Sequence, residues 1–207
     1  MVETDETNSW LARLRQGQAN ALAELFEHHR PRLRRMVQMR MDPRAAGRVD
    51  PSDVLQEAYL DAAEGVQQYA ENPTVSSYVW LRGLTWERLM RILRRHLGAK
   101  CRTAQRECPL PGESSIFLAK QLLAGQSTPS KALRREELQH RVQGALQALD
   151  AVDREVILMR HFEDMSNREI AEALQLSDSG ASMRYGRAVF RLKQFLMTDS
   201  GKQVPQP

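Results

Sequence analysis

The chain has 207 residues, of which 42% are hydrophobic and 27% charged, with a formal net charge of +4. This composition excludes a disordered or collagen-like chain, and the length suffices for one large domain or two small ones. No stretch has the length and apolarity of a membrane span, and the polar start MVETDETNSW is no secretory signal, so we expect a cytoplasmic protein without membrane insertion.

The N-terminal half shows about four helical patterns between residues 9 and 100. Apolar residues recur at helical spacing on both sides of a break near RQGQA (15–19), again after Pro51, and again from Val79 to Leu93. Pro51 is favoured in the first turn of a helix. No strand alternation or hairpin turn signal interrupts this pattern. We therefore expect residues 9–100 to form a helical domain, with residues 1–8 as a disordered acidic tail.

Residues 50–64 contain five acidic residues and no lysine or arginine. Asp53, Glu57 and Asp61 are spaced by four, so they share one helix face, where like charges repel by a few tenths of a kcal/mol per pair. The face is either solvated or a docking surface, and the lack of a basic residue within 50–64 favours a basic partner. The three carboxylates spread over about 12 Å of helix, too far apart to share a metal ion.

A basic and aromatic segment follows, because residues 82–106 contain eight Lys/Arg and one acid. Arginine side chains can hold phosphates, and aromatic rings can stack on unpaired bases. The alternative for the tryptophans is core packing, which we favour for Trp80, whereas Trp86 is expected to be partly exposed. The charge segregation between this segment and residues 50–64 indicates two different partners, one polyanionic and one basic.

Residues 101–135 are predicted to form a flexible linker. They contain three of the nine prolines with several serines and glycines, and a short helix fits only the stretch SSIFLAKQLLAG. Cys101 and Cys108 are too few for a disulfide framework and suit a reducing compartment. With His96 they match no familiar zinc spacing, so no metal is expected.

Residues 136–197 are predicted to form a second helical domain, followed by a loose tail at 198–207. One helix runs through Leu138–Leu149, and DREVILMRHFED forms another with Asp153 as its cap. Ser166 and Glu169 match a capping box for a third helix. Gln175 occupies the turn position that often holds glycine, where a left-handed conformation costs about 1 kcal/mol. Packing of Leu174 and Leu176 must therefore hold this turn.

The last two helices are joined by only three or four residues, so they must cross steeply, as in a helix-turn-helix whose second helix enters the DNA major groove. Arg184, Arg187 and Arg191 form a basic edge on that second helix, although a solvated face would show the same spacing. The sequence has no Gly-rich phosphate loop, no His-Glu-x-x-His and no nucleophile motif. We therefore expect neither an enzyme nor a bound cofactor.

Three stretches in this order resemble the bacterial RNA polymerase sigma factors of the extracytoplasmic-function (ECF) group. DPSDVLQEAYLDAAEGVQQY is similar to the second conserved region, whose core D-x-x-Q-E-x-[FY] falls on Asp53, Gln56, Glu57 and Tyr59. SSYVWLRGLTWERLMRILRRH is similar to the aromatic and basic segment that follows. LDAVDREVILMRHFEDMSNREIAEALQLSDSGASMRYGRAVFRLK is similar to the fourth region with its helix-turn-helix. The resemblance covers about residues 9–197.

The resemblance implies that the chain binds core RNA polymerase, through its β′ and β subunits, and directs it to promoter DNA. A basic coiled coil of β′ would contact Asp53, Leu55, Gln56, Glu57 and Asp61. The −10 element would meet Tyr78, Arg82, Trp86, Glu87, Arg88, Arg91, Arg94 and Arg95, with the loop near 69–77 capturing an unstacked base. The −35 element would meet Ser179, Ser182, Met183, Arg184, Gly186, Arg187 and Arg191, of which Arg184 and Arg191 would lie nearest the phosphates.

Two departures and two rival readings accompany the resemblance. Ser182 stands where family members often carry a basic residue, and Met183 and Gly186 offer no hydrogen-bonding side chain, so the −35 sequence cannot be copied from relatives. The arginine-rich RILRRH also replaces amides found in other members. The first rival, a stand-alone helix-turn-helix regulator, would explain residues 137–197 only. The second rival is an enzyme with a helical fold, for which no sequence motif proposes an active site. Because family members are often sequestered by anti-sigma proteins, such a partner is also expected.

Overall fold

The structure is a computed structural model that describes residues 2–18, 20–41, 49–97 and 135–198, together with 114, 117 and 118. Every regular element among these residues is an α-helix, which confirms the predicted all-α class. The first group comprises α1 (Val2–Arg15), α2 (Asn20–Arg40), α3 (Pro51–Glu71) and α4 (Ser77–Leu97). The second comprises α7 (Arg135–Ala148), α8 (Ala151–Phe162), α9 (Asn167–Leu174) and α10 (Asp178–Thr198).

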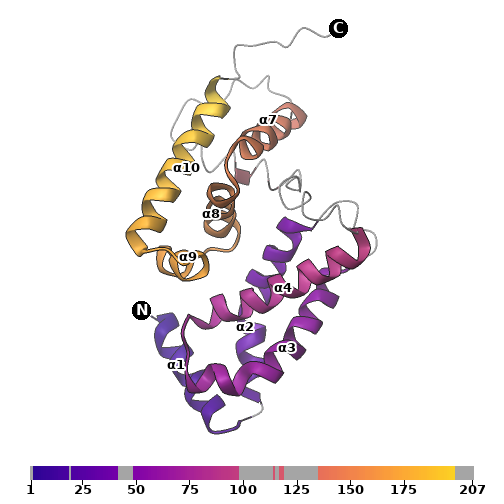
Figure 1. Cartoon of the computed structure of the whole chain (residues 1–207), viewed down its shortest axis with the longest axis vertical. Helices are drawn as coiled ribbons and strands as arrows, with labels where there is room; N and C mark the ends of the chain where they lie inside the picture. Colours follow the sequence, from indigo (N-terminus) through magenta and orange to yellow (C-terminus); the bar gives the residue numbers. More distant parts are fainter. Residues whose placement is uncertain are drawn as a thin grey trace.

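The two helical groups lie one above the other, with α8 and α9 facing α2 and α4 (Figure 1). Helix α1 begins at Val2, so the predicted disordered tail over 1–8 is corrected for residues 2–8. The predicted linker at 101–135 and tail at 198–207, with Cys101 and Cys108, lie almost entirely outside the described residues.

Burial of the apolar stripes produces two cores, and the second group of helices contributes to both. Leu25, Leu33, Leu55 and Leu81 are among the fully buried side chains of α2, α3 and α4. Met165 and Ile170, beside and within α9, belong to this same cluster rather than to the core of α7, α8 and α10. Conversely, Met39 of α2, Leu118 and Leu192 share the second core. The two groups are therefore packed together by apolar contacts as well as polar ones.

Helix caps explain where several elements start and stop. Asp50 accepts a hydrogen bond from the Ser52 N–H (2.7 Å) at the start of α3. Asp150, and not the predicted Asp153, caps α8 by accepting from the Val152 and Asp153 N–H groups. Asp153 lies three residues further on, within the first turn. The N-cap is decided by which carboxylate reaches the free N–H groups of the first turn.

The helix-turn-helix forms as the sequence indicates. The capping box of Ser166 and Glu169 is present in both directions. Gln175 adopts the left-handed conformation, with φ 55° and ψ 44°, and the Leu176 N–H donates to the Ala171 carbonyl (2.9 Å). Leu174 packs against the first core. Backbone hydrogen bonding and apolar packing thus offset the strain of a non-glycine residue in this turn.

His29 makes the stability of the fold sensitive to mild acid. Its ring is 1% exposed, and its Nε2 lies 3.0 Å from the Ser77 hydroxyl. Burial, followed by the nearby His28 and Arg32, lowers the pKa of His29 to about 3. Because the unfolded chain binds the proton more readily, this stabilising contribution is complete above the ordinary histidine pKa and is lost as the pH falls below it.

We expect the free energy of unfolding to fall by about 1.4 kcal/mol for each pH unit below about 6.5 on account of His29. Urea unfolding at a series of pH values measures this slope. His29→Gln should flatten it, because glutamine does not titrate in this range. Burial also lowers the pKa of His161, so part of the slope remains in the His29 variant. An unchanged slope in His29→Gln would contradict the assignment.

Candidate nucleic-acid and polymerase interfaces

The acidic stripe of α3 is divided between solvent and an internal ion pair. Asp53 and Gln56 are exposed. Arg88 of α4 donates from Nε to Asp61 (2.8 Å) and from Nη1 to Glu57 (3.1 Å). Although residues 50–64 contain no lysine or arginine, Arg88 of another helix compensates Glu57 and Asp61, so these two carboxylates do not require a basic partner. Of the three carboxylates only Asp53 is exposed, with the neighbouring Gln56 also exposed.

The leucine of α3 that is presented to solvent is Leu60, not the predicted Leu55. Leu55, predicted to contact polymerase, is 2% exposed and belongs to the first core, so that prediction is wrong for the free chain. Leu60 is 61% exposed and lies on the same side of α3 as Gln56 and Glu64. An apolar side chain surrounded by polar ones is typical of the centre of a protein interface. The missed signal was that Leu60 falls off the apolar period of the helix.

The residues predicted to meet the −10 element are separated by the structure into two sets. Tyr78 and Arg82 are buried, because the Tyr78 hydroxyl and Arg82 Nε donate to Glu163 at 2.8 and 2.7 Å. Arg88 is held by α3, and Trp86 is half-buried beside Arg40. The exposed set lies toward the C-terminal end of α4 and consists of Glu87, Arg91, Arg94 and Arg95.

Trp80 is partly buried and packs against the core of the first group of helices, in line with the expected packing role. Its ring is stacked on Tyr69, with 4.2 Å between ring centroids and an interplanar angle of 2°. The Tyr69 hydroxyl donates to the Val75 carbonyl (2.9 Å) and so anchors the loop between α3 and α4. Residues 72–74 of this loop are exposed. The aromatic pair therefore positions a short exposed loop at the start of α4.

The predicted −35 residues lie on α10, and most of them are exposed. Ser179, Ser182, Met183, Gly186 and Arg187 are presented to solvent. Among the described residues, no hydrogen bond or ion pair of Arg187 is found.

The two arginines predicted nearest the phosphates are tied to α8 in the free chain. Arg184 donates to Asp153 Oδ1 (3.0 Å), and Arg191 donates to Asp153 Oδ2 (3.1 Å). Both arginine side chains remain partly exposed, whereas Asp153 is 4% exposed. These arginines neutralise the charge of the buried Asp153 carboxylate. A contact of either arginine with a DNA phosphate would be made in addition to this ion pair.

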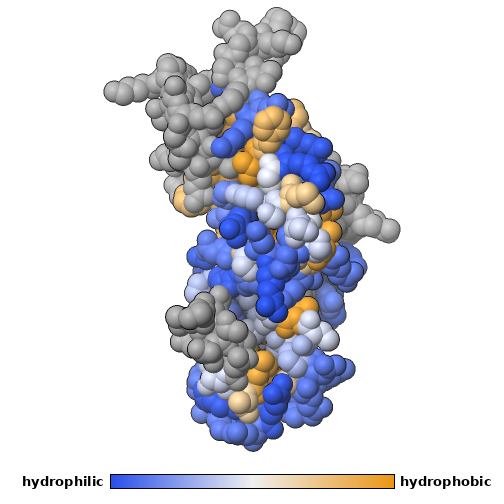
Figure 2. Space-filling view, turned by 90° about the vertical axis from the view of Figure 1, so that its left-hand side faces the viewer, coloured by the Kyte–Doolittle hydropathy of each residue, from blue (hydrophilic) through white to orange (hydrophobic). Residues whose placement is uncertain are grey.

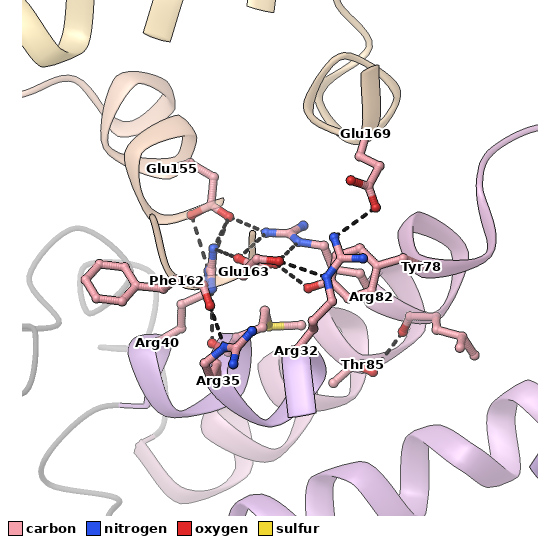
Figure 3. A network of polar contacts seen from close by, with 12 residues as sticks. Arg32, Arg35, Arg40, Tyr78, Arg82, Thr85, Glu155, Phe162, Glu163 and Glu169 are labelled. Atoms are coloured by element: carbon pink, nitrogen blue, oxygen red, sulfur yellow. Dashed lines mark hydrogen bonds and ion pairs between the residues drawn. The ribbon is translucent and has the colours of Figure 1, made fainter. Parts of the chain in front are cut away.

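A buried ion-pair network joins the two groups of helices, and no sequence pattern indicates it. Glu163, at the end of α8, is fully buried and bonded to Arg40, Tyr78 and Arg82 (Figure 3). Burial alone raises the pKa of Glu163, but Arg40 and Arg82 outweigh it and lower the pKa to about 2. Arg40 and Glu163 are 123 positions apart in the chain, so no sequence periodicity links them and only the tertiary structure reveals their ion pair.

On the face shown in Figure 2, hydrophilic residues dominate and apolar ones form small separate patches. Among the described residues, no cluster of three His, Cys, Asp or Glu side chains could hold a metal ion. Helices long and apolar enough to cross a membrane are absent from the same residues.

Comparisons with known proteins agree with the sequence motifs. Residues 139–192 match the family described as Sigma-70, region 4. The fold is similar to that of CnrH, solved in complex with the cytosolic domain of CnrY, with a TM-score of 0.57 and 22% sequence identity. The similarity covers 94% of this chain and 99% of that one. A search among curated proteins found no match. The family match covers the predicted helix-turn-helix, and the structural similarity shows the overall fold.

Proposed function

We propose that this chain, which carries a sigma-70 region 4 domain on the fold of an ECF sigma factor, binds core RNA polymerase and directs promoter-specific transcription initiation. The observation that carries the proposal is the helix-turn-helix of α9 and α10 within the matched region, with Ser182, Met183 and Arg187 exposed on its second helix. This is the geometry with which such a helix enters a major groove. The −35 element is its proposed target.

The first group of helices is proposed to hold the polymerase and the −10 element. Asp53, Gln56 and Leu60 form an exposed face of α3 with an apolar centre, which suits a basic coiled coil of β′. The exposed arginines near the end of α4, Arg91, Arg94 and Arg95, suit DNA phosphates. The protein acts in the cytoplasm as a binding subunit rather than as an enzyme, contacts β as well as β′, and is a target for an anti-sigma protein.

Reconstitution with core RNA polymerase tests this function. The purified chain should co-migrate with core polymerase in gel filtration and support transcription from a subset of promoter fragments that core polymerase alone does not transcribe. A stand-alone regulator would bind promoter fragments without co-migrating with core polymerase. That outcome would overturn the proposal and would indicate that the exposed face of α3 is a solvated surface and not a docking surface.

A further inference from the structure

Helix α10 presents two large apolar side chains to solvent on one of its faces. Met183 is 56% exposed, and Phe190 is 62% exposed, the largest exposed fraction among the large apolar side chains of the described residues. The two residues are separated by seven positions, so they lie on the same side of the helix, two turns from each other. Large apolar side chains on one exposed face indicate a surface that contacts another molecule.

Gly186 lies between these two side chains and leaves an open space beside the helix. It is exposed and belongs to the interior of α10. Its two chain neighbours and the helix backbone aside, no described atom lies within 4 Å of the position that a Cβ atom would take. The side chains of Met183 and Phe190 therefore do not fill this space. We call it the Gly186 gap.

The fold itself gives no reason for a glycine at position 186. The backbone of Gly186 is not in the left-handed region, and an alanine methyl group would meet no neighbour there. Glycine stabilises a helix interior less than alanine does, because its backbone loses more freedom on folding. What glycine offers at such an exposed position is close approach of another molecule to the helix backbone.

The second exposed glycine of this kind lacks the apolar neighbours. Gly144, within α7, also has no atom within 4 Å of its Cβ position. However, the large exposed apolar side chains of the described residues do not include any from α7. The combination of an open glycine with large apolar side chains on both sides is therefore a feature of α10, and Gly144 provides a matched control.

Basic side chains beside this face indicate that its partner is polyanionic. Arg187 and Arg191 are exposed, and Arg184 is partly exposed. The face and these arginines lie within residues 139–192, which match sigma-70 region 4. Double-stranded DNA offers phosphates to the arginines and, in its major groove, one apolar group, the C5-methyl group of thymine. DNA thus fits both the charge and the apolar character of this surface.

We propose that Met183, Gly186 and Phe190 recognise thymine by apolar contact with its C5-methyl group, so that the chain selects a −35 element containing thymine. Met183 and Phe190 supply the contact area, and the Gly186 gap admits the edge of the base to the helix backbone. No hydrogen bond is needed, because thymine alone carries a methyl group in the major groove. The inference rests on the proposed function, since it names the sequences that its DNA-reading helix selects.

Replacement of thymine by uracil in the DNA tests the proposal, because uracil lacks only the C5-methyl group. The full chain bound to core RNA polymerase first selects duplexes from a pool that is randomised in the −35 element. Each thymine of a selected duplex is then replaced singly, and fluorescence anisotropy measures the affinity of the complex. At one or more positions the wild type should lose about fourfold in affinity, the effect of burying one methyl group. Met183→Ala or Phe190→Ala should abolish this difference between thymine and uracil.

Gly186→Ala should change stability and DNA affinity in opposite directions. It should raise the melting temperature by about 1–4 °C, because alanine is the better helix residue. It should also lower the affinity for the selected duplex by about tenfold, because the added methyl group occupies the Gly186 gap. Gly144→Ala should raise the melting temperature similarly and leave the affinity unchanged. Phe195→Ala removes a ring that is 45% exposed on another side of α10 and should leave the uracil effect unchanged.

The proposal is overturned if uracil lowers the affinity of the wild type at no thymine, or if Gly186→Ala does not lower it. It is also overturned if Met183→Ala and Phe190→Ala weaken binding to core polymerase but keep the uracil effect, because the face would then be a protein-docking surface. A chain that does not bind core polymerase contradicts the proposed function instead. Titration of the same duplexes, before selection, with the chain alone then decides the recognition of thymine, and the absence of any methyl dependence again overturns it.

Discussion

Leu60→Asp is expected to weaken binding of the chain to core RNA polymerase by about tenfold or more without lowering its thermal stability. The side chain is 61% exposed, so the fold gains little from it. At the centre of an interface, however, the substitution removes the apolar contact area of Leu60 and places a charge in a desolvated position, and both changes cost affinity. Equilibrium titration of fluorescently labelled core polymerase measures the change, and thermal unfolding followed by circular dichroism measures the stability.

Leu55→Ala is the matched comparison on the same helix. Leu55 is 2% exposed, so removing its side chain should cost about 2–5 kcal/mol of stability. Any loss of polymerase binding in this variant should follow the loss of folded protein and should recover at lower temperature. If Leu60→Asp binds polymerase as tightly as the wild type, Leu60 is outside the interface and the proposed docking face of α3 is reduced to Asp53 and Gln56.

The second expected result concerns the exposed arginine of α10. Arg187→Ala should weaken binding to a selected promoter by about 1–3 kcal/mol if the side chain contacts a guanine in the bidentate manner, while binding to unrelated DNA should change little. A loss that is equal on all sequences would instead assign Arg187 to a phosphate. Competition binding with promoter and random DNA fragments separates the two, and unchanged binding would exclude Arg187 from the interface.

Arg184→Ala provides the control for this variant. Arg184 lies one turn before Arg187 and contacts the buried Asp153, so its loss should lower the melting temperature of the second group of helices. Its effect on DNA binding should not depend on DNA sequence. A sequence-dependent effect of Arg184→Ala at unchanged stability would show that its contact with Asp153 is exchanged for a base contact in the complex.

Local features of this protein were predictable because they depend on neighbours in the chain. The capping box at Ser166, the break at 15–19 and the helical character of α3 and α4 follow from spacing and backbone chemistry within a few residues. Gln175 was identified as a strained turn position, and the structure places it in the left-handed region. The exposed part of α10 also follows from its apolar period, which buries Ala188 and Leu192 and leaves Ser182, Met183 and Arg187 outside.

The partners of the charged side chains were decided by the tertiary structure alone. Arg88 neutralises Glu57 and Asp61 from another helix, and Glu163 draws Arg82 away from the surface where its sequence context placed it. A charge interacts with whatever the fold brings within a few ångströms, and sequence spacing carries no record of that distance. The sequence by itself therefore determined the helices, the capping box at Ser166 and the exposed face of α10, whereas the packing of α8 and α9 on α2 and α4 decided which charges stay available to partners.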